Sequence, residues 1–187
     1  LWLGTYILMM LLTAGLTYIF PESAQNATEQ TMALIENKPL ILIVFAMAFM
    51  PALCEETAFR GFFFGTLSNK FKIATAILWT GAIFGLYHMS IVKFFAVGFL
   101  GGVIAYAVYK SGSIWVGVLM HFVNNLAAVC ISLYPDFFEK ALPFLFSESI
   151  SMNTMIILTV TGVALFLVSI FLLKHTAGDF AKNKQEK

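Results

Sequence analysis

Three ionisable residues stand together inside a long apolar stretch. Glu55, Glu56 and Arg60 are the only Asp, Glu, Lys or Arg residues between Pro39 and Leu67. A charge at the centre of a bilayer-spanning helix costs about 2.5–3.5 kcal/mol on insertion scales. Three unpaired charges would together cost about 8–10 kcal/mol, comparable to the stability of a whole domain. Such residues within membrane segments usually mark a functional site, so we expect a reaction centre or a transport site inside the membrane.

The spacing of these residues gives each a different expected role. Glu56 and Arg60 are four residues apart and so lie on one helical face, where they can form a structural ion pair. Glu55 points about 100° away around the helix and is left as the unpaired carboxylate. A carboxyl group in this position can accept a proton and return it, as general base and then general acid.

Two histidines and an asparagine lie in other apolar segments. Counted along the helices from the turn at Asn69, Glu55 and His88 lie about 21 and 28 Å from one membrane face. Counted from the turn at Gly112, His121 and Asn125 lie about 13 and 20 Å from the same face. Asn125 follows His121 by one turn, so both can face one cavity, whereas Asn124 would hydrogen-bond between helices. Each group also has a plainer interpretation, His88 as an interfacial cap and the His121–Asn125 pair as packing. Together they predict a polar site near the middle of the bilayer.

The composition places the whole chain in a membrane. Of its 187 residues, 60% are hydrophobic and 11% charged, and the mean hydropathy is +0.88. These values exclude a water-soluble domain, and a net charge of +1 gives no indication of nucleic-acid binding. The two cysteines, Cys54 and Cys130, are expected to be small buried hydrophobes rather than a disulfide.

The apolar segments predict an all-α fold, a polytopic membrane helix bundle with about six transmembrane helices. Six segments are long enough to cross about 30 Å of hydrocarbon. They are residues 1–20, 39–67, 72–89, 91–109, 113–134 and 154–174, with longer polar loops over 21–38 and 135–153. The second segment is overlong for one crossing, so we expect it to tilt, to kink at Pro51, or to project past the headgroups.

The lysines orient the predicted bundle. If the helices alternate, one side carries Lys70, Lys72, Lys110, Lys174, Lys182, Lys184 and Lys187, and the other carries Lys38, Lys93 and Lys140. This bias places both termini in the cytoplasm. We expect a single domain over residues 1–187 with a polar cytoplasmic tail at 175–187. The first residue is leucine rather than methionine, so whether helices precede it in the natural protein is open, and no basic stretch indicates a signal peptide.

Glycines predict where helices approach one another closely. Three pairs have the small-xxx-small spacing that lets backbones pack in lipid, namely Gly61–Gly65, Gly81–Gly85 and Gly98–Gly102.

Three short motifs of this chain, in order on successive apolar segments, resemble a known family. They are Glu55-Glu56-x-x-x-Arg60, Phe84-x-x-x-His88 and His121-x-x-x-Asn125. This combination resembles the signature of the CPBP family, which comprises the type II CAAX prenyl endopeptidases and their bacterial relatives, the CAAX protease and bacteriocin-processing proteins. The resemblance covers about residues 40–130, which would form the catalytic core.

The resemblance implies an intramembrane protease with a defined set of site residues. Glu55 would activate a water, and His88 would orient and polarise it. His121 and Asn125 would form the oxyanion hole, while Glu56 and Arg60 would hold the helix that presents Glu55. No cofactor and no metal are expected. The chain lacks His-Glu-x-x-His, and its candidate ligands are spread over three helices. Zinc remains an alternative, because two histidines and one or two glutamates could still bind a metal.

The resemblance also leaves functional alternatives. The expected partners are a peptide or lipidated peptide substrate and membrane lipid, with no nucleic acid, and the expected location is a bacterial cell membrane. The substrate and the oligomeric state cannot be read from the sequence. A non-catalytic membrane partner, such as a bacteriocin self-immunity or regulatory protein, and a proton or ion carrier that uses the buried carboxylates are the competing classes.

Overall fold

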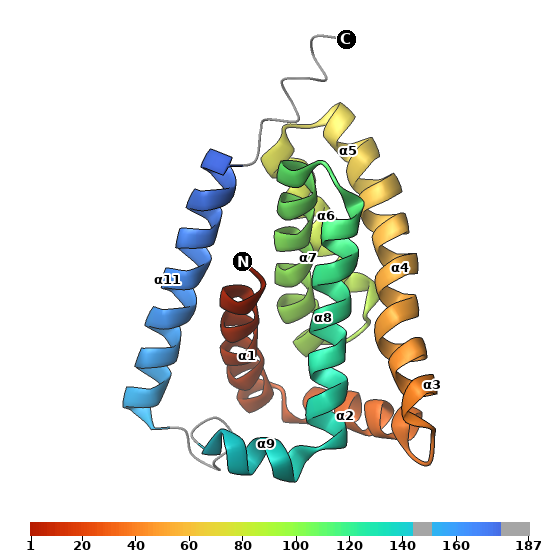
Figure 1. Cartoon of the computed structure of the whole chain (residues 1–187), viewed down its shortest axis with the longest axis vertical. Coiled ribbons are helices and arrows are strands. Elements are labelled where there is room, and N and C mark those ends of the chain that lie inside the picture. Colours follow the sequence, from red (N-terminus) through yellow and green to blue (C-terminus); the bar gives the residue numbers. More distant parts are fainter. Residues whose placement is uncertain (144–150, 177–187) are drawn as a thin grey trace.

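The computed structural model describes residues 1–143 and 151–176, and within these residues the regular structure is entirely helical (Figure 1). The helices outside the motif-bearing segment 40–70 are α1 (Trp2–Ile19), α2 (Pro21–Ile35), α6 (Ile73–Tyr87), α7 (Ile91–Ser111), α8 (Ile114–Leu133), α9 (Pro135–Ala141) and α11 (Met152–Thr176). The predicted all-α helix bundle is confirmed. Most of the predicted polar tail, residues 177–187, lies outside the described residues.

Five helices of the described chain are long and apolar enough to cross a membrane. They are Trp2–Ile19, Leu40–Lys70, Ile91–Ser111, Ile114–Leu133 and Met152–His175. The remaining predicted crossing, 72–89, contains the shorter apolar helix α6, which has 15 residues and is therefore about 22 Å long. It ends at His88 because the chain turns at once into α7: Met89 adopts a left-handed φ of 49°, and Ser90 caps the next helix.

The two polar segments that were predicted as loops contain helices. In 21–38 the helix α2 begins with Pro21 and Glu22, a residue pair that suits a first turn, since proline needs no amide partner there and an acid favours the helix N-terminus. In 135–153 the short helix α9 also begins with a proline, Pro135. Both lie across one end of the bundle, at the bottom of Figure 1.

The segment 40–70 forms one continuous helix that contains two π-helical segments. Its parts are α3 (Leu40–Val44), the π-helical η1 (Phe45–Phe49), α4 (Met50–Glu56), the π-helical η2 (Thr57–Phe64) and α5 (Gly65–Lys70). Pro51 therefore does not end the helix, and a π-helical segment directly precedes α4, in which Pro51 stands in the first turn. The second π-helical segment begins immediately after Glu56 and contains Arg60. Wide turns of this kind often occur at functional sites.

The α6–α7 hairpin is the most extensive helix pair and depends on glycine. A Cβ at Gly81 would lie 2.7 Å from the carbonyl oxygen of Gly98, and one at Gly85 would collide with the carbonyl oxygen of Phe94. This close packing was predicted from the glycine spacing and is confirmed. The same prediction is wrong for Gly61 and Gly65, because only one side-chain atom lies near Gly61 and nothing lies within 4 Å of a Cβ at Gly65.

The order of the helices in space agrees with the predicted alternation. Figure 1 shows the C-terminal ends of α5, α7 and α11 at one end of the bundle, with α2 and α9 at the other. The long helix 40–70 lies beside α8 and near α6, so the three motif-bearing segments are neighbours.

Candidate active site

The buried centre of the bundle is the ion pair between Glu56 and Arg60. Their side chains are fully buried, and Arg60 Nη1 donates to Glu56 Oε1 at 2.8 Å. Arg60 Nη2 donates to the carbonyl oxygen of Gly101 on α7 at 2.7 Å, and the guanidinium carbon lies 4.7 Å from the centre of the Phe84 ring. Arg60 therefore ties the helix 40–70 to both α6 and α7.

His121 joins this pair from α8. Its Nδ1 lies 2.8 Å from the same oxygen of Glu56 that accepts from Arg60. An ionised carboxylate only accepts hydrogen bonds, so Nδ1 carries the proton in this contact. The contact between His121 and Glu56 was not predicted, because the i,i+4 spacing offered Arg60 as the partner of Glu56. The one available signal was that a carboxylate oxygen accepts more than one bond.

Glu55 faces the other nitrogen of the same imidazole. Its Oε2 lies 3.9 Å from His121 Nε2, within ion-pair distance but too far for a hydrogen bond. This oxygen is buried and has no hydrogen-bond partner among the described residues, while the Glu55 side chain as a whole is 19% exposed. Glu55 also interacts electrostatically with His88 and Arg60. It is thus the carboxylate at the edge of the cluster, and Glu56 is the one at its centre.

His88 lies at the C-terminal end of α6 and is half-buried. Its Nδ1 lies 2.9 Å from the carbonyl oxygen of Phe84, which can only accept, so the Nδ1 proton points back along the helix. The Phe84 ring lies between the two imidazoles, with ring centres 5.1 Å from His88 and 5.6 Å from His121. The first residue of the second motif thus packs against both histidines and Arg60.

The two asparagines of α8 differ from one another in burial. Asn124 is only 7% exposed, and its Oδ1 has no hydrogen-bond partner in the described part of the chain, so that oxygen does not make the predicted interhelical bond. Asn125 is half-buried, one turn beyond His121. Within residues 1–143 and 151–176 the side chain of Asn125 does not hydrogen-bond to Glu55, His88 or His121.

A groove reaches this cluster from the outside of the bundle. Its volume is about 530 Å³, and it runs between the helix 40–70 and α6, where its lining consists of Cys54, Glu55, Ala58, Phe59, Phe63, Ile83, Leu86 and Tyr87. Glu55 is the ionisable carboxylate in an otherwise largely apolar wall, a combination typical of a binding site with one reactive group. We refer to it as the Glu55 groove.

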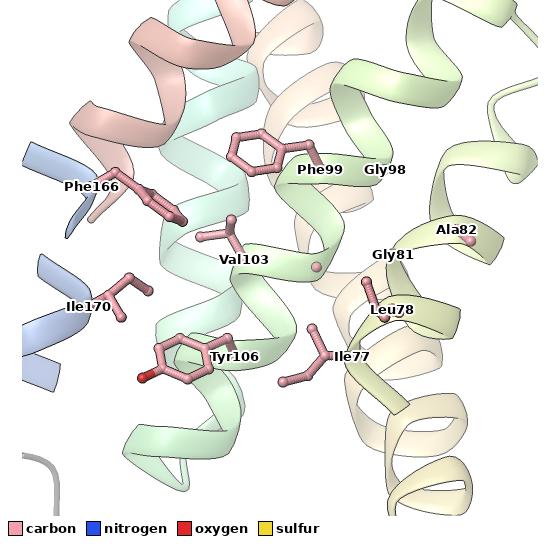
Figure 2. A pocket seen from close by; sticks show the side chains of 11 residues that line it. Ile77, Leu78, Gly81, Ala82, Gly98, Phe99, Val103, Tyr106, Phe166 and Ile170 are labelled. Carbon is pink, nitrogen blue, oxygen red and sulfur yellow. The ribbon is translucent and has the colours of Figure 1, made fainter. Parts of the chain in front are cut away.

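A second groove, of about 320 Å³, lies between α6, α7 and α11 (Figure 2). Its walls include Phe99, Val103, Phe166 and Ile170, and the hydroxyl group of Tyr106 is the polar side-chain group in it. No residue of the three motifs lines it. It therefore offers apolar packing space but no group for acid–base chemistry.

Among the described residues, no three His, Cys, Asp or Glu side chains are arranged to hold a metal ion. Glu56 Oε1 pairs with Arg60 and His121, whereas Glu55 Oε2 and Glu56 Oε2 have no hydrogen-bond partner among the described residues.

Comparison with known proteins finds one family model and one curated relative. Residues 37–127 match the family model described as "Type II CAAX prenyl endopeptidase Rce1-like". The match covers 91 of the 187 residues, so the chain is similar to this family over its motif-bearing segment. It is also 27% identical over 119 residues to the "Putative membrane peptidase YdiL" of Bacillus subtilis (strain 168), an alignment that covers 63% of this chain and 48% of that protein. The chain thus spans about half the length of the curated relative it matches. No solved structure matches it.

The matched segment contains all six candidate site residues, from Glu55 to Asn125. The match to this membrane-protease family and the five long apolar helices of the described chain together make this an integral membrane protein. The Glu55 carboxylate lines a groove and lies near the imidazoles of His88 and His121. Such an arrangement can exchange protons with a bound water.

Proposed function

We propose that this Rce1-like protein is an intramembrane endopeptidase that hydrolyses a peptide bond in a membrane-associated or lipidated peptide. The observation that carries the proposal is the position of His121, which contacts Glu56 through one nitrogen and faces Glu55 through the other. Glu55 in turn lines the groove through which a substrate would arrive. The match of residues 37–127 to the Rce1-like family model supports the same class of reaction.

In the proposed reaction Glu55 is the base. Its carboxylate takes a proton from a water molecule while the water oxygen bonds to the carbonyl carbon of the substrate. His88, whose Nδ1 proton is held by the Phe84 carbonyl, orients that water through Nε2. Glu55 then gives the proton to the leaving amine as the carbon–nitrogen bond breaks, and the products are a carboxylic acid and an amine.

The negative charge that develops on the carbonyl oxygen needs donors. We assign this role to the Nε2 side of His121 and to the Asn125 amide, which extends from the next turn of α8. Nε2 donates only while the ring carries both protons, since Glu56 holds the proton on Nδ1. One such donor typically stabilises a transition state by about 3–4 kcal/mol.

The buried ion pair has a supporting role in this scheme. Arg60 fixes Glu56 against α7, and Glu56 fixes the ring of His121. Because Glu55 is adjacent to Glu56 on the same helix, the ion pair also fixes the position of Glu55 in the groove wall. Residues 40–130 then form the catalytic core of a single domain over residues 1–187.

The setting of the proposed enzyme is a bacterial cell membrane with both chain termini in the cytoplasm. The last turns of α5, α7 and α11 each carry a lysine, and they lie at one end of the bundle, which supports this orientation. The substrate is a peptide that reaches the Glu55 groove from the lipid or from its surface.

A cleavage assay tests this function. Purified protein in detergent micelles is incubated with a library of acyl- or prenyl-modified and unmodified peptides, and the products are identified by mass spectrometry. We expect cleavage at one internal peptide bond, equally fast with and without a chelator. Loss of activity with the chelator and recovery with zinc would replace the metal-free mechanism. Failure to cleave any peptide, by protein that remains folded, would favour a non-catalytic membrane partner.

A further inference from the structure

A buried glycine on α8 lies against the central carboxylate. Gly117 precedes His121 by one helical turn and belongs to none of the three motifs. A Cβ built on Gly117 would lie 2.9 Å from Glu56 Oε2, 2.8 Å from Val108 Cγ2 and 3.1 Å from Ile104 Cγ2. Real Cβ atoms essentially never approach a neighbour closer than 3.0 Å, so any larger residue here must displace something.

The carboxylate cannot move away without loss. Glu56 Oε1 accepts from both Arg60 Nη1 and His121 Nδ1, each at 2.8 Å, while Oε2 is buried against Gly117 without a hydrogen-bond partner. A rotation of the carboxylate that relieves Oε2 therefore displaces Oε1 from both donors. The shape of α8 at Gly117 and the two hydrogen bonds of Oε1 fix the same group from opposite sides.

We infer that Gly117 is a positioning residue for the reaction, an inference that rests on the proposed function. The space left by its missing side chain sets the place of the Glu56 carboxylate, and Glu56 sets the orientation of the His121 ring. His121 Nε2 lies 3.9 Å from Glu55, so a tilt of the ring changes the geometry of the groups that would hold the water and the oxyanion. Misplacing a reacting group by about 1 Å can lower a rate about 100-fold.

The surroundings of Gly117 differ from those of the other close-packed glycines in the described chain. A Cβ at Gly81 or Gly85 would meet the backbone of α7, and one at Gly162 would meet the apolar side chains of Ile7 and Leu8. Gly117 is the glycine within residues 1–143 and 151–176 whose added Cβ would meet a charged side chain. Packing alone explains these three. Gly101 also borders the site, but an added Cβ there would meet the Phe84 ring, whereas at Gly117 it would meet the central carboxylate.

Three variants separate positioning from packing. Gly117→Ala crowds Glu56, Val108 and Ile104, and Gly117→Ala combined with Val108→Ala removes the closest apolar contact of the added methyl group. Gly162→Ala is the matched control, a buried helical glycine whose added methyl meets only side chains far from the motifs. For each variant, the thermal unfolding midpoint, kcat and KM are measured on one peptide that the wild type cleaves.

We expect Gly117→Ala to lower kcat at least about tenfold with KM within about twofold of wild type, because the reacting groups and not the groove have shifted. Adding Val108→Ala should return the unfolding midpoint toward wild type and leave kcat low. Gly162→Ala should change the midpoint without changing kcat. An unchanged kcat in Gly117→Ala, or a kcat restored together with stability by Val108→Ala, would overturn the inference.

A second readout does not depend on activity. In protein with ¹⁵N-labelled histidine, the Nδ1 proton of His121 should resonate far downfield, since it is bonded to a carboxylate. The variant that carries both Gly117→Ala and Val108→Ala should shift this resonance upfield, and Gly162→Ala should not. If the wild type cleaves no peptide, the proposed function fails, yet this shift still tests the position of the ring. An identical resonance in all three proteins would refute the role of Gly117.

Discussion

Removing Arg60 while keeping Glu56 should destabilise the bundle strongly. In Arg60→Met the apolar volume is largely retained, but Glu56, whose side chain is fully buried, keeps His121 as its only donor among the residues that the structure describes. The bonds lost are the 2.8 Å contact with Glu56 and the 2.7 Å contact with the Gly101 carbonyl. Hydrogen bonds to charged groups contribute about 1.5–3 kcal/mol each, and breaking a buried ion pair from one side costs about 3–5 kcal/mol.

Membrane bundles lower this figure, because the unfolded chain in a micelle also finds partners and measured side-chain bonds there average about 0.6 kcal/mol. For two charged bonds and a stranded carboxylate we therefore expect a loss of about 3 kcal/mol in the free energy of unfolding. The double variant Glu56→Gln/Arg60→Met should be less destabilised than Arg60→Met, since it strands no charge.

Unfolding is followed by titration with sodium dodecyl sulfate in mixed micelles, with helical circular dichroism as the signal. Lys72→Met, which removes an exposed lysine before α6, is the control and should change the free energy by less than about 0.5 kcal/mol. If Arg60→Met cost no more than that control, or if the double variant were destabilised as much as Arg60→Met or more, the ion pair would not be the centre described above.

Two further predictions concern the groove and the helix packing. Ala58→Trp, which fills the Glu55 groove, should raise KM at least tenfold by blocking the substrate, whereas Ala82→Trp in the second groove (Figure 2) should not; equal effects would argue against the Glu55 groove as the binding site. Gly65→Ala should stabilise the protein by up to about 1 kcal/mol, because nothing lies within 4 Å of an added Cβ and alanine favours a helix. Gly85→Ala should destabilise the protein, because the added methyl group pushes α6 away from α7. Unfolding titrations in which both variants shift in the same direction would contradict this packing.

The bundle itself was predictable because the bilayer constrains it so strongly. Apolar runs long enough to span hydrocarbon must be helical, since no water is there to satisfy the backbone. The glycine spacing of Gly81, Gly85 and Gly98 likewise predicted the tight α6–α7 pair. The same reasoning failed for Gly61 and Gly65, because spacing does not tell which face of a helix meets another helix.

The polar segments were harder to predict. Residues 21–38 have no apolar run, so the helix α2 is specified by local signals such as the proline and acid of its first turn. The π-helical segments around Pro51 and Arg60 also leave no periodic signal in the sequence. They change the winding of the helix between Leu40 and Lys70, and with it the direction in which each motif side chain points.

The site was predictable in its members and not in its contacts. Charge placement singled out Glu55, Glu56 and Arg60, and the i,i+4 rule predicted the ion pair that the structure contains. The bond between His121 and Glu56 joins residues 65 positions apart, and it depends on how α8 is rotated against the helix 40–70. Rotation is set by packing, and Gly117, which lies against the Glu56 carboxylate, is a residue that no rule based on charge or spacing would have selected.

The most direct test of the central claim compares wild type with Glu55→Gln on one cleavable peptide, with the unfolding free energy of both proteins measured in the same micelles. Glutamine keeps the shape of the side chain at the groove edge but cannot take a proton from water. We predict that kcat falls by about 10²–10⁴-fold, the usual contribution of a general base, while the free energy of unfolding is unchanged or rises. A Glu55→Gln protein that cleaves at the wild-type rate would contradict the assignment of Glu55 as the base.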